Sequence, residues 1–237
     1  MAPIARELVS DGGILEPLQT HATLSGQIKE LQAVLEEYGD PPITLAGFSW
    51  GAWLSFMFAA QYPEMVKKLI LISSGSFKDK YVTGMQQLRI SRLSRVERIK
   101  LEALIDMLDD PEVKDKSFSF TRFGKLFSKA DAYDPISLES EVIEYQFDIF
   151  QSVWKEAEQL RRTGTLLQLG KKITCPVTAI HGDYDSHPAQ GVQQPLSSVL
   201  KNFHFIMLKN CGHKPWIERK ARSEFFRVLR EELDLGE

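Results

Sequence analysis

Short apolar runs separated by helix-like stretches constrain the fold of this chain more than any other feature. The runs lack the polar alternation of a strand with one face in water, and apolar side chains recur at helical spacing between them. Strands that are apolar throughout are typical of a parallel sheet with both faces covered by helices. The predicted strands are residues 43–46, 69–72, 177–180 and 203–208. The sequence therefore predicts an α/β protein.

Helical patterns divide the chain into two parts. In the sheet-forming part, helices are predicted near residues 3–9, 24–38, 50–62 and 217–233, and residues 13–15 form either a short strand or an extended turn. The part from 77 to 172 contains no buried-strand run. There, Ser94 and Glu97 form a capping box before a helix that ends at 109–111, and a second helical pattern covers 138–162. We expect 77–172 to be a helical cap inserted into an α/β core of residues 1–76 and 173–237.

Composition argues against several classes of protein. The chain has 237 residues, enough for one large domain, and a net charge of -3 without a Lys/Arg cluster, which argues against a nucleic-acid partner. Without an apolar run of about 18–20 residues, no membrane partner is expected. Cys175 and Cys211 are too few for a disulfide framework, and the N-terminus lacks a signal-peptide pattern, so we expect a cytoplasmic protein.

The segment Gly-Phe-Ser-Trp-Gly at residues 47–51 joins a predicted strand directly to a predicted helix. A sharp turn of this kind strains its apex, Ser49, and crowds its neighbours, so Gly47 and Gly51 are expected because neither has a Cβ. The Ser49 hydroxyl would stand at the start of the helix, where the N–H of Trp50 is free to stabilise an oxyanion. The segment predicts a nucleophilic serine.

A nucleophilic serine needs a base, and the base needs an acid that orients it. Asp185 follows the strand at 177–180, and His213 follows the strand at 203–208, which gives the order Ser49, Asp185, His213. Asp183 is the alternative acid. Cys175 and Cys211 are expected to be buried and unreactive.

Histidines and aspartates alternate after the third predicted strand. His181, Asp183, Asp185 and His187 would share one face of an extended strand, as in a metal site, but Gly182 and Pro188 break such a strand. We therefore expect no metal ion and no other cofactor, and we interpret His181 and His187 as structural.

Three segments of the chain resemble a known family. "GFSWGA", "IHGDYDSHP" and "CGHKPWIE" look like the nucleophile, acid and histidine blocks of α/β-hydrolase-fold serine hydrolases, and most of all like those of the proline-iminopeptidase-like branch. The resemblance covers about residues 1–75 and 165–237. It implies a three-layer α/β-hydrolase fold with a mostly parallel sheet, and the family pattern Gly-x-x-Asp places the acid at Asp185. Dehalogenases and epoxide hydrolases resemble this fold but carry Asp at the position of Ser49.

The N-terminal region departs from the family pattern. Family members begin with about three further strands and a His-Gly-Gly-type loop that supplies a second oxyanion donor, and residues 1–8 look like the helix after that loop. The resemblance implies either that the sequence is part of a longer protein or that the fold is N-terminally shortened. In the shortened form the oxyanion hole keeps the Trp50 N–H alone, and losing one donor costs about 10²–10³ in rate. The strand at 43–46 would then be an exposed apolar edge, so we expect a homo-oligomer through that edge.

These features predict a serine hydrolase that cleaves an ester, amide or related bond of a small molecule through an acyl-serine intermediate. The resemblance leaves an aminopeptidase as one alternative, with Glu139, Glu141 or Glu144 binding the substrate's ammonium group. The absent loop leaves another, a binding or regulatory protein that keeps the fold without useful turnover.

Overall fold

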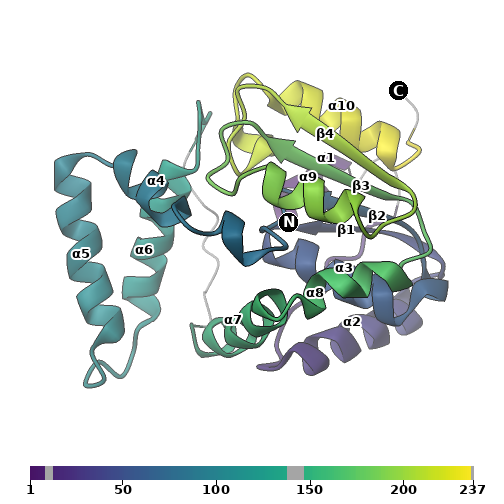
Figure 1. Ribbon diagram of the computed structural model, residues 1–237, viewed down its shortest axis with the longest axis horizontal. Coiled ribbons are helices and arrows are strands. Elements are labelled where there is room, and N and C mark those ends of the chain that lie inside the picture. The colour runs from purple at the N-terminus through teal and green to yellow at the C-terminus, as the bar shows by residue number, and fades with distance from the viewer. Residues whose placement is uncertain (9–12, 138–146, 236–237) are drawn as a thin grey trace.

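The computed structural model describes residues 1–8, 13–137 and 147–235. Its centre is a parallel sheet of four strands in the order β1-β2-β3-β4 (Figure 1). The register places Leu45 beside Leu69 and Leu69 beside Val177. The strands are β1 (Ile43–Phe48), β2 (Val66–Ile72), β3 (Val177–Gly182) and β4 (Phe203–Leu208). All four apolar runs that were predicted to be strands are strands.

Helices cover both faces of the sheet. Leu69 and Leu71 of β2 pack into the same cluster as α2 and α3, whereas Ile70 and Ile72 pack on the opposite face with α1 and α10 (Figure 1). All four side chains are fully buried, and burial of a side chain of this size stabilises a fold by about 1.5–3 kcal/mol. The helices are α1 (Ala2–Leu8), α2 (Leu24–Tyr38), α3 (Trp50–Gln61), α9 (Gln190–Ser197) and α10 (Arg222–Glu232).

The middle of the chain contributes helices to two places. The first three, α4 (Met85–Ser91), α5 (Arg95–Asp109) and α6 (Ser117–Ala130), stand apart from the sheet around their own core of Leu93, Leu101 and Ala130 (Figure 1). The next two, α7 (Phe147–Arg162) and α8 (Thr165–Leu169), instead bury Val153, Ala157 and Leu166 against α2 and α3. The division into a core and a cap at residues 77 and 172 stays a prediction.

The predicted capping box is present at the start of α5. The Ser94 side chain accepts a hydrogen bond from the Glu97 N–H at 3.3 Å, and the Glu97 carboxylate accepts one from the Ser94 N–H at 2.9 Å. Lys129 of α6 pairs with the same carboxylate. The box therefore fixes the start of α5 and ties α5 to α6.

Other elements were left open or differ from the prediction. Of the two alternatives for residues 13–15, the strand is not formed, and the apolar side chains of Ile14, Leu15 and Leu18 are exposed. The last helix begins at Arg222 rather than 217, because Pro215–Ile217 form a short 3-10 turn (η5) and the Glu218 side chain turns inward. The pattern at 138–162 is helical from Phe147 onward, and residues 138–146, with Glu139, Glu141 and Glu144, lie outside the described residues.

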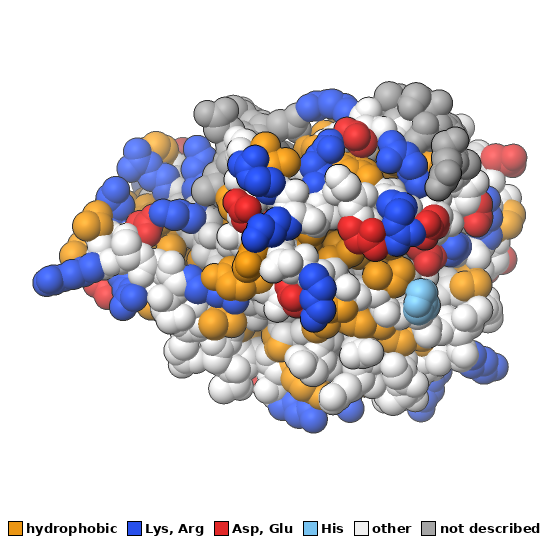
Figure 2. Space-filling model, turned by 90° about the horizontal axis from the view of Figure 1, so that it is seen from above, with side chains coloured by type: hydrophobic (Ala, Val, Ile, Leu, Met, Phe, Trp, Pro, Cys, Tyr) orange, Lys and Arg blue, Asp and Glu red, His pale blue; other side chains and the backbone are white. Residues whose placement is uncertain are grey.

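β1 forms one edge of the sheet, and all of its residues except Gly47 are only partly buried. Self-association through this edge stays a prediction. On the face shown in Figure 2, basic, acidic and apolar side chains are interspersed. Across the described ranges, no helix has the length and apolar character needed to cross a membrane.

Candidate active site

Ser49 occupies a strained turn between β1 and α3. Its backbone has φ 53° and ψ −114°, and its N–H donates to the carbonyl of Ile72 at 3.0 Å. A Cβ on Gly47 would lie 2.2 Å from the backbone oxygen of Gly51, so residue 47 must be glycine for the turn to close. Strain of this kind persists only where the surrounding structure fixes it, as β1 and α3 do here.

Crowding is not found at Gly51 itself. A Cβ there would meet no atom within 4 Å, apart from the neighbouring residues and backbone of its own helix. The close approach is made by the Gly51 carbonyl rather than by its Cα. The expected requirement for glycine at 51 is therefore not supported, whereas the one at 47 is.

Three side chains from distant parts of the chain form a hydrogen-bonded row. His213 Nε2 lies 3.0 Å from Ser49 Oγ, and His213 Nδ1 lies 2.7 Å from Asp185 Oδ2. Because a carboxylate only accepts hydrogen bonds, the proton of His213 is on Nδ1, and Nε2 accepts from the serine hydroxyl. Each residue follows the carboxyl end of a strand (β1, β3 and β4), and in a parallel sheet these ends lie along one edge.

Asp185 is almost completely buried, with 6% of its surface exposed. Burial opposes its charged form, but His213 and His187 outweigh that effect and hold the pKa of Asp185 well below its usual range. The carboxylate therefore remains charged and able to orient His213 throughout the neutral pH range.

Asp183 is directed to a different neighbour. Its Oδ1 accepts a hydrogen bond from the backbone N–H of Cys211 at 3.3 Å, and its Oδ2 lies 3.7 Å from Lys209 Nζ. The structure therefore pairs Asp185, and not the alternative acid Asp183, with His213.

Trp50 starts α3 with a backbone N–H that, within the described residues, has no acceptor. The first N–H groups of a helix have no partner inside it, and this one stands directly after Ser49. The Trp50 indole points elsewhere, donating to Gln19 Oε1 at 3.0 Å and lying edge-on to Trp154. The N–H is thus available to an anion that forms at Ser49.

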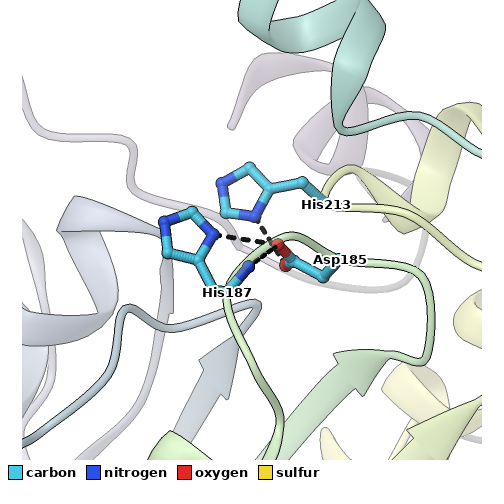
Figure 3. Close-up of side chains that lie close together, drawn as sticks. All are labelled: Asp185, His187 and His213. Atoms are coloured by element: carbon cyan, nitrogen blue, oxygen red, sulfur yellow. Dashed lines mark hydrogen bonds and ion pairs between the residues drawn. The ribbon is translucent and has the colours of Figure 1, made fainter. Parts of the chain in front are cut away.

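Two further histidines, which the sequence pattern marks only as structural, lie beside Asp185. His187 places its Nδ1 at 2.9 Å from Asp185 Oδ1 and stacks on the ring of His213, with centroids 4.7 Å apart (Figure 3). His181, fully buried, donates from Nε2 to the backbone oxygen of His187 at 2.9 Å. The signal was present in the alternation of His and Asp after β3, although the chain turns there instead of extending.

Asp185, His187 and His213 are also the residues that could hold a metal ion. Each offers one ligand atom, and these atoms lie within 4.8 Å of one another. Both Nδ1 atoms donate to Asp185, however, so metal binding would require their protons to leave. The arrangement fits a hydrogen-bonded acid and base better than it fits a metal ion.

The cysteines are not nucleophiles of this site. Burial is the main factor that raises the pKa of the Cys175 thiol and, together with nearby carboxylates, that of the fully buried Cys211 thiol. Both thiols therefore remain protonated at neutral pH; Cys211 is buried as expected, whereas Cys175 is only partly buried.

A second buried carboxylate, Glu218, holds the loop that carries His213. Its Oε1 accepts from the backbone N–H groups of Tyr133 and Gly212, and its Oε2 accepts from that of Asp134, at 2.7–3.0 Å. The segment 131–136 also contacts this loop directly, because the His213 N–H donates to the Asp131 carbonyl at 2.9 Å. Nothing in the sequence pattern distinguished Glu218 from an exposed glutamate.

Comparison with known proteins agrees with this architecture. The profile of the α/β hydrolase fold family matches residues 17–219. A proline iminopeptidase from Thermoplasma volcanium is 24% identical over 222 residues, covering 90% of this chain and 73% of the relative. Epoxide hydrolase 1 from Caenorhabditis elegans is 25% identical over 207 residues, covering 83% of this chain but only 48% of the relative, so the chain spans about half the length of that protein.

Solved structures share the fold. The crystal structure of a proline iminopeptidase from Mycobacterium smegmatis superimposes with a TM-score of 0.59 at 19% identity, covering 98% of this chain and 83% of that one. At an identity this low, the likeness shows a shared fold and does not show a shared substrate. With the family profile matched over most of its length, and with a parallel sheet covered on both faces, the chain belongs to the α/β hydrolase fold family.

Proposed function

We propose that this protein is a serine hydrolase that cleaves an ester, amide or related acyl bond of a small molecule. The observation that carries the proposal is the continuous row from Ser49 Oγ through His213 to Asp185, with contacts of 3.0 and 2.7 Å. Such a row lets an imidazole remove the serine proton while the carboxylate stabilises the imidazolium that forms.

In the first half of the proposed reaction, Ser49 Oγ attacks the carbonyl carbon while His213 Nε2 takes the hydroxyl proton. The oxyanion of the tetrahedral intermediate accepts a hydrogen bond from the Trp50 N–H. Collapse of the intermediate breaks the bond to the leaving alcohol or amine, which receives the proton from His213. Water then attacks the acyl-serine with the same base, which releases the acid and restores the Ser49 hydroxyl.

A fluorophosphonate probe tests this proposal, because it labels a serine only where a neighbouring base activates the hydroxyl. We expect labelling of Ser49, loss of labelling in Ser49→Ala, and unchanged labelling in Ser197→Ala, a control at an exposed serine of α9. A folded protein that is not labelled and hydrolyses no aryl ester contradicts the proposal. Thermal stabilisation by a ligand without turnover would then favour a binding or regulatory protein.

An aminopeptidase is the second candidate, and the likeness to two proline iminopeptidases favours it. Ser49 at the turn between β1 and α3 fits that branch, whereas the branch of epoxide hydrolases carries Asp there. Aminoacyl-arylamides compared with simple aryl esters separate the two candidates. Turnover of arylamides with a free amino group, and loss of turnover when that group is acetylated, would support the aminopeptidase, and activity on esters alone would reject it.

A further inference from the structure

His187 has no part in the proposed reaction, yet it contacts both of the groups that support Ser49. It lies two residues after Asp185, and 13% of its side chain is exposed. Its Nδ1 and its backbone N–H both donate to Asp185 Oδ1, each at 2.9 Å. The other oxygen of the same carboxylate accepts from His213. The two imidazoles, which lie next to each other, therefore each hold one oxygen of Asp185 (Figure 3).

The charge state of His187 suits this position. Burial lowers the pKa of His187 below the usual histidine range, and His213 and Arg89 act in the same direction, whereas Asp185 acts against them. The ring is therefore neutral at neutral pH, with its proton on Nδ1 toward the carboxylate. A neutral ring can stack on His213 at 4.7 Å without repelling the imidazolium that the proposed reaction forms there.

The backbone of His187 is also fixed. His181 of β3 is fully buried and donates to the His187 carbonyl at 2.9 Å. Pro188 follows His187 and restricts the backbone conformation of residue 187. A side chain that is anchored at its backbone can in turn fix the group to which it donates.

We propose that His187 is a positioning residue, whose Nδ1–H holds the Asp185 carboxylate so that Oδ2 faces His213. This inference rests on the proposed function, because the alignment it describes serves the transfer of the Ser49 proton. Without the Nδ1 donor, the His187 backbone N–H alone holds Oδ1, and a less firmly aligned acid should slow the chemical step without changing substrate binding.

Two substitutions separate the donor from the ring. His187→Asn places an amide N–H near the position of Nδ1, whereas His187→Phe keeps a stacked ring without a donor. For hydrolysis of an activated aryl ester, we expect His187→Phe to lower kcat by about 10- to 100-fold with KM within about twofold, because a hydrogen bond to a charged group is lost. His187→Asn should stay within a few-fold of the unsubstituted protein. His204→Phe, at an exposed histidine of β4, is the matched control and should change neither constant.

Proton NMR supplies a readout that does not depend on turnover. The proton between His213 Nδ1 and Asp185 should give a strongly downfield resonance in the unsubstituted protein and in His187→Asn, and this resonance should be lost or broadened in His187→Phe. Full activity of His187→Phe, or equal impairment of both variants, would overturn the inference. If His187→Phe does not fold, the test depends on His187→Asn. A kcat equal to that of the unsubstituted protein, together with the downfield resonance, supports the inference, and loss of both the activity and the resonance contradicts it. Failure of the proposed function would be recognised separately, by turnover that persists in Ser49→Ala.

Discussion

Asp185 and Glu218 are both buried carboxylates beside His213, but they are held by different kinds of donor. Asp185 accepts hydrogen bonds from two imidazoles and one backbone N–H, whereas Glu218 accepts three, all from backbone N–H groups. An imidazole can move its proton from one nitrogen to the other, and a backbone amide cannot. Similar burial therefore serves two roles: Asp185 can respond to a change of charge on His213, and Glu218 keeps the surrounding loops in place.

Replacement of Asp185 by Asn should produce the largest effect. The amide keeps the shape of the side chain, but with its oxygen toward His187 it presents N–H₂ to His213, which then holds its proton on Nε2 and cannot accept that of Ser49. We expect kcat for an aryl ester to fall by about 10⁴-fold, as such a change of tautomer does in serine proteases. The melting temperature should change little, because His213 adapts by moving a proton. If Asp185→Asn instead lost much stability and kept activity, Asp185 would have a structural role like that of Glu218, and the contrast between the two carboxylates would be wrong.

Replacement of Glu218 by Gln should mainly lower stability. Its oxygen can still accept from two of the three backbone N–H groups, but its N–H₂ then faces the third donor, and no tautomer relieves that contact. We expect the free energy of unfolding to fall by about 2–4 kcal/mol, measured by urea denaturation. Glu224→Gln, at an exposed glutamate paired with Arg227, is the control and should change stability by less than about 1 kcal/mol. Unchanged stability in Glu218→Gln would contradict the structural role.

The pH dependence of stability should show a smaller effect, at the Asp185 site. Burial lowers the pKa of His187 in the folded protein, so the unfolded chain binds this proton more readily, and stability should decrease as pH falls below about 6.5. The lowered pKa of Asp185, held down by His213 and His187 against the effect of burial, acts in a separate window, where stability is lost as pH falls below about 3.9. Thermal melts from pH 7.5 to 5 should show a smaller decrease in His187→Phe. An identical decrease in both proteins would show that other groups cause it.

The sheet could be predicted from sequence because its strands are buried on both faces. β4 has the predicted bounds, and the other strands extend the predicted runs by two or three residues. Helix α2 also has the predicted bounds, because its apolar face and the proline pair after it mark both the helix and its end. The start of α10 was predicted too early, since the inward turn of Glu218 depends on tertiary contacts to Tyr133 and Asp134.

The site could be predicted only where a residue type has one evident use. A serine between glycines at a strand-to-helix junction is typical of a nucleophile, and the order of Asp185 and His213 followed from it. His187 could not be assigned, because its role depends on the turn after β3 that brings its ring onto His213. Glu218 could not be assigned either, since two of its three partners, Tyr133 and Asp134, lie some 85 residues away in sequence.

The contacts between segment 131–136 and the His213 loop limit how this protein can be recombined with its relatives. A chimera that takes residues 77–137 from another hydrolase discards the Asp131 carbonyl and the Tyr133 and Asp134 amides together with the helices. A chimera that exchanges only residues 85–130, α4 to α6, leaves those groups in their own chain. The helices can thus be exchanged alone, while the residues directly after them must be inherited with the histidine loop.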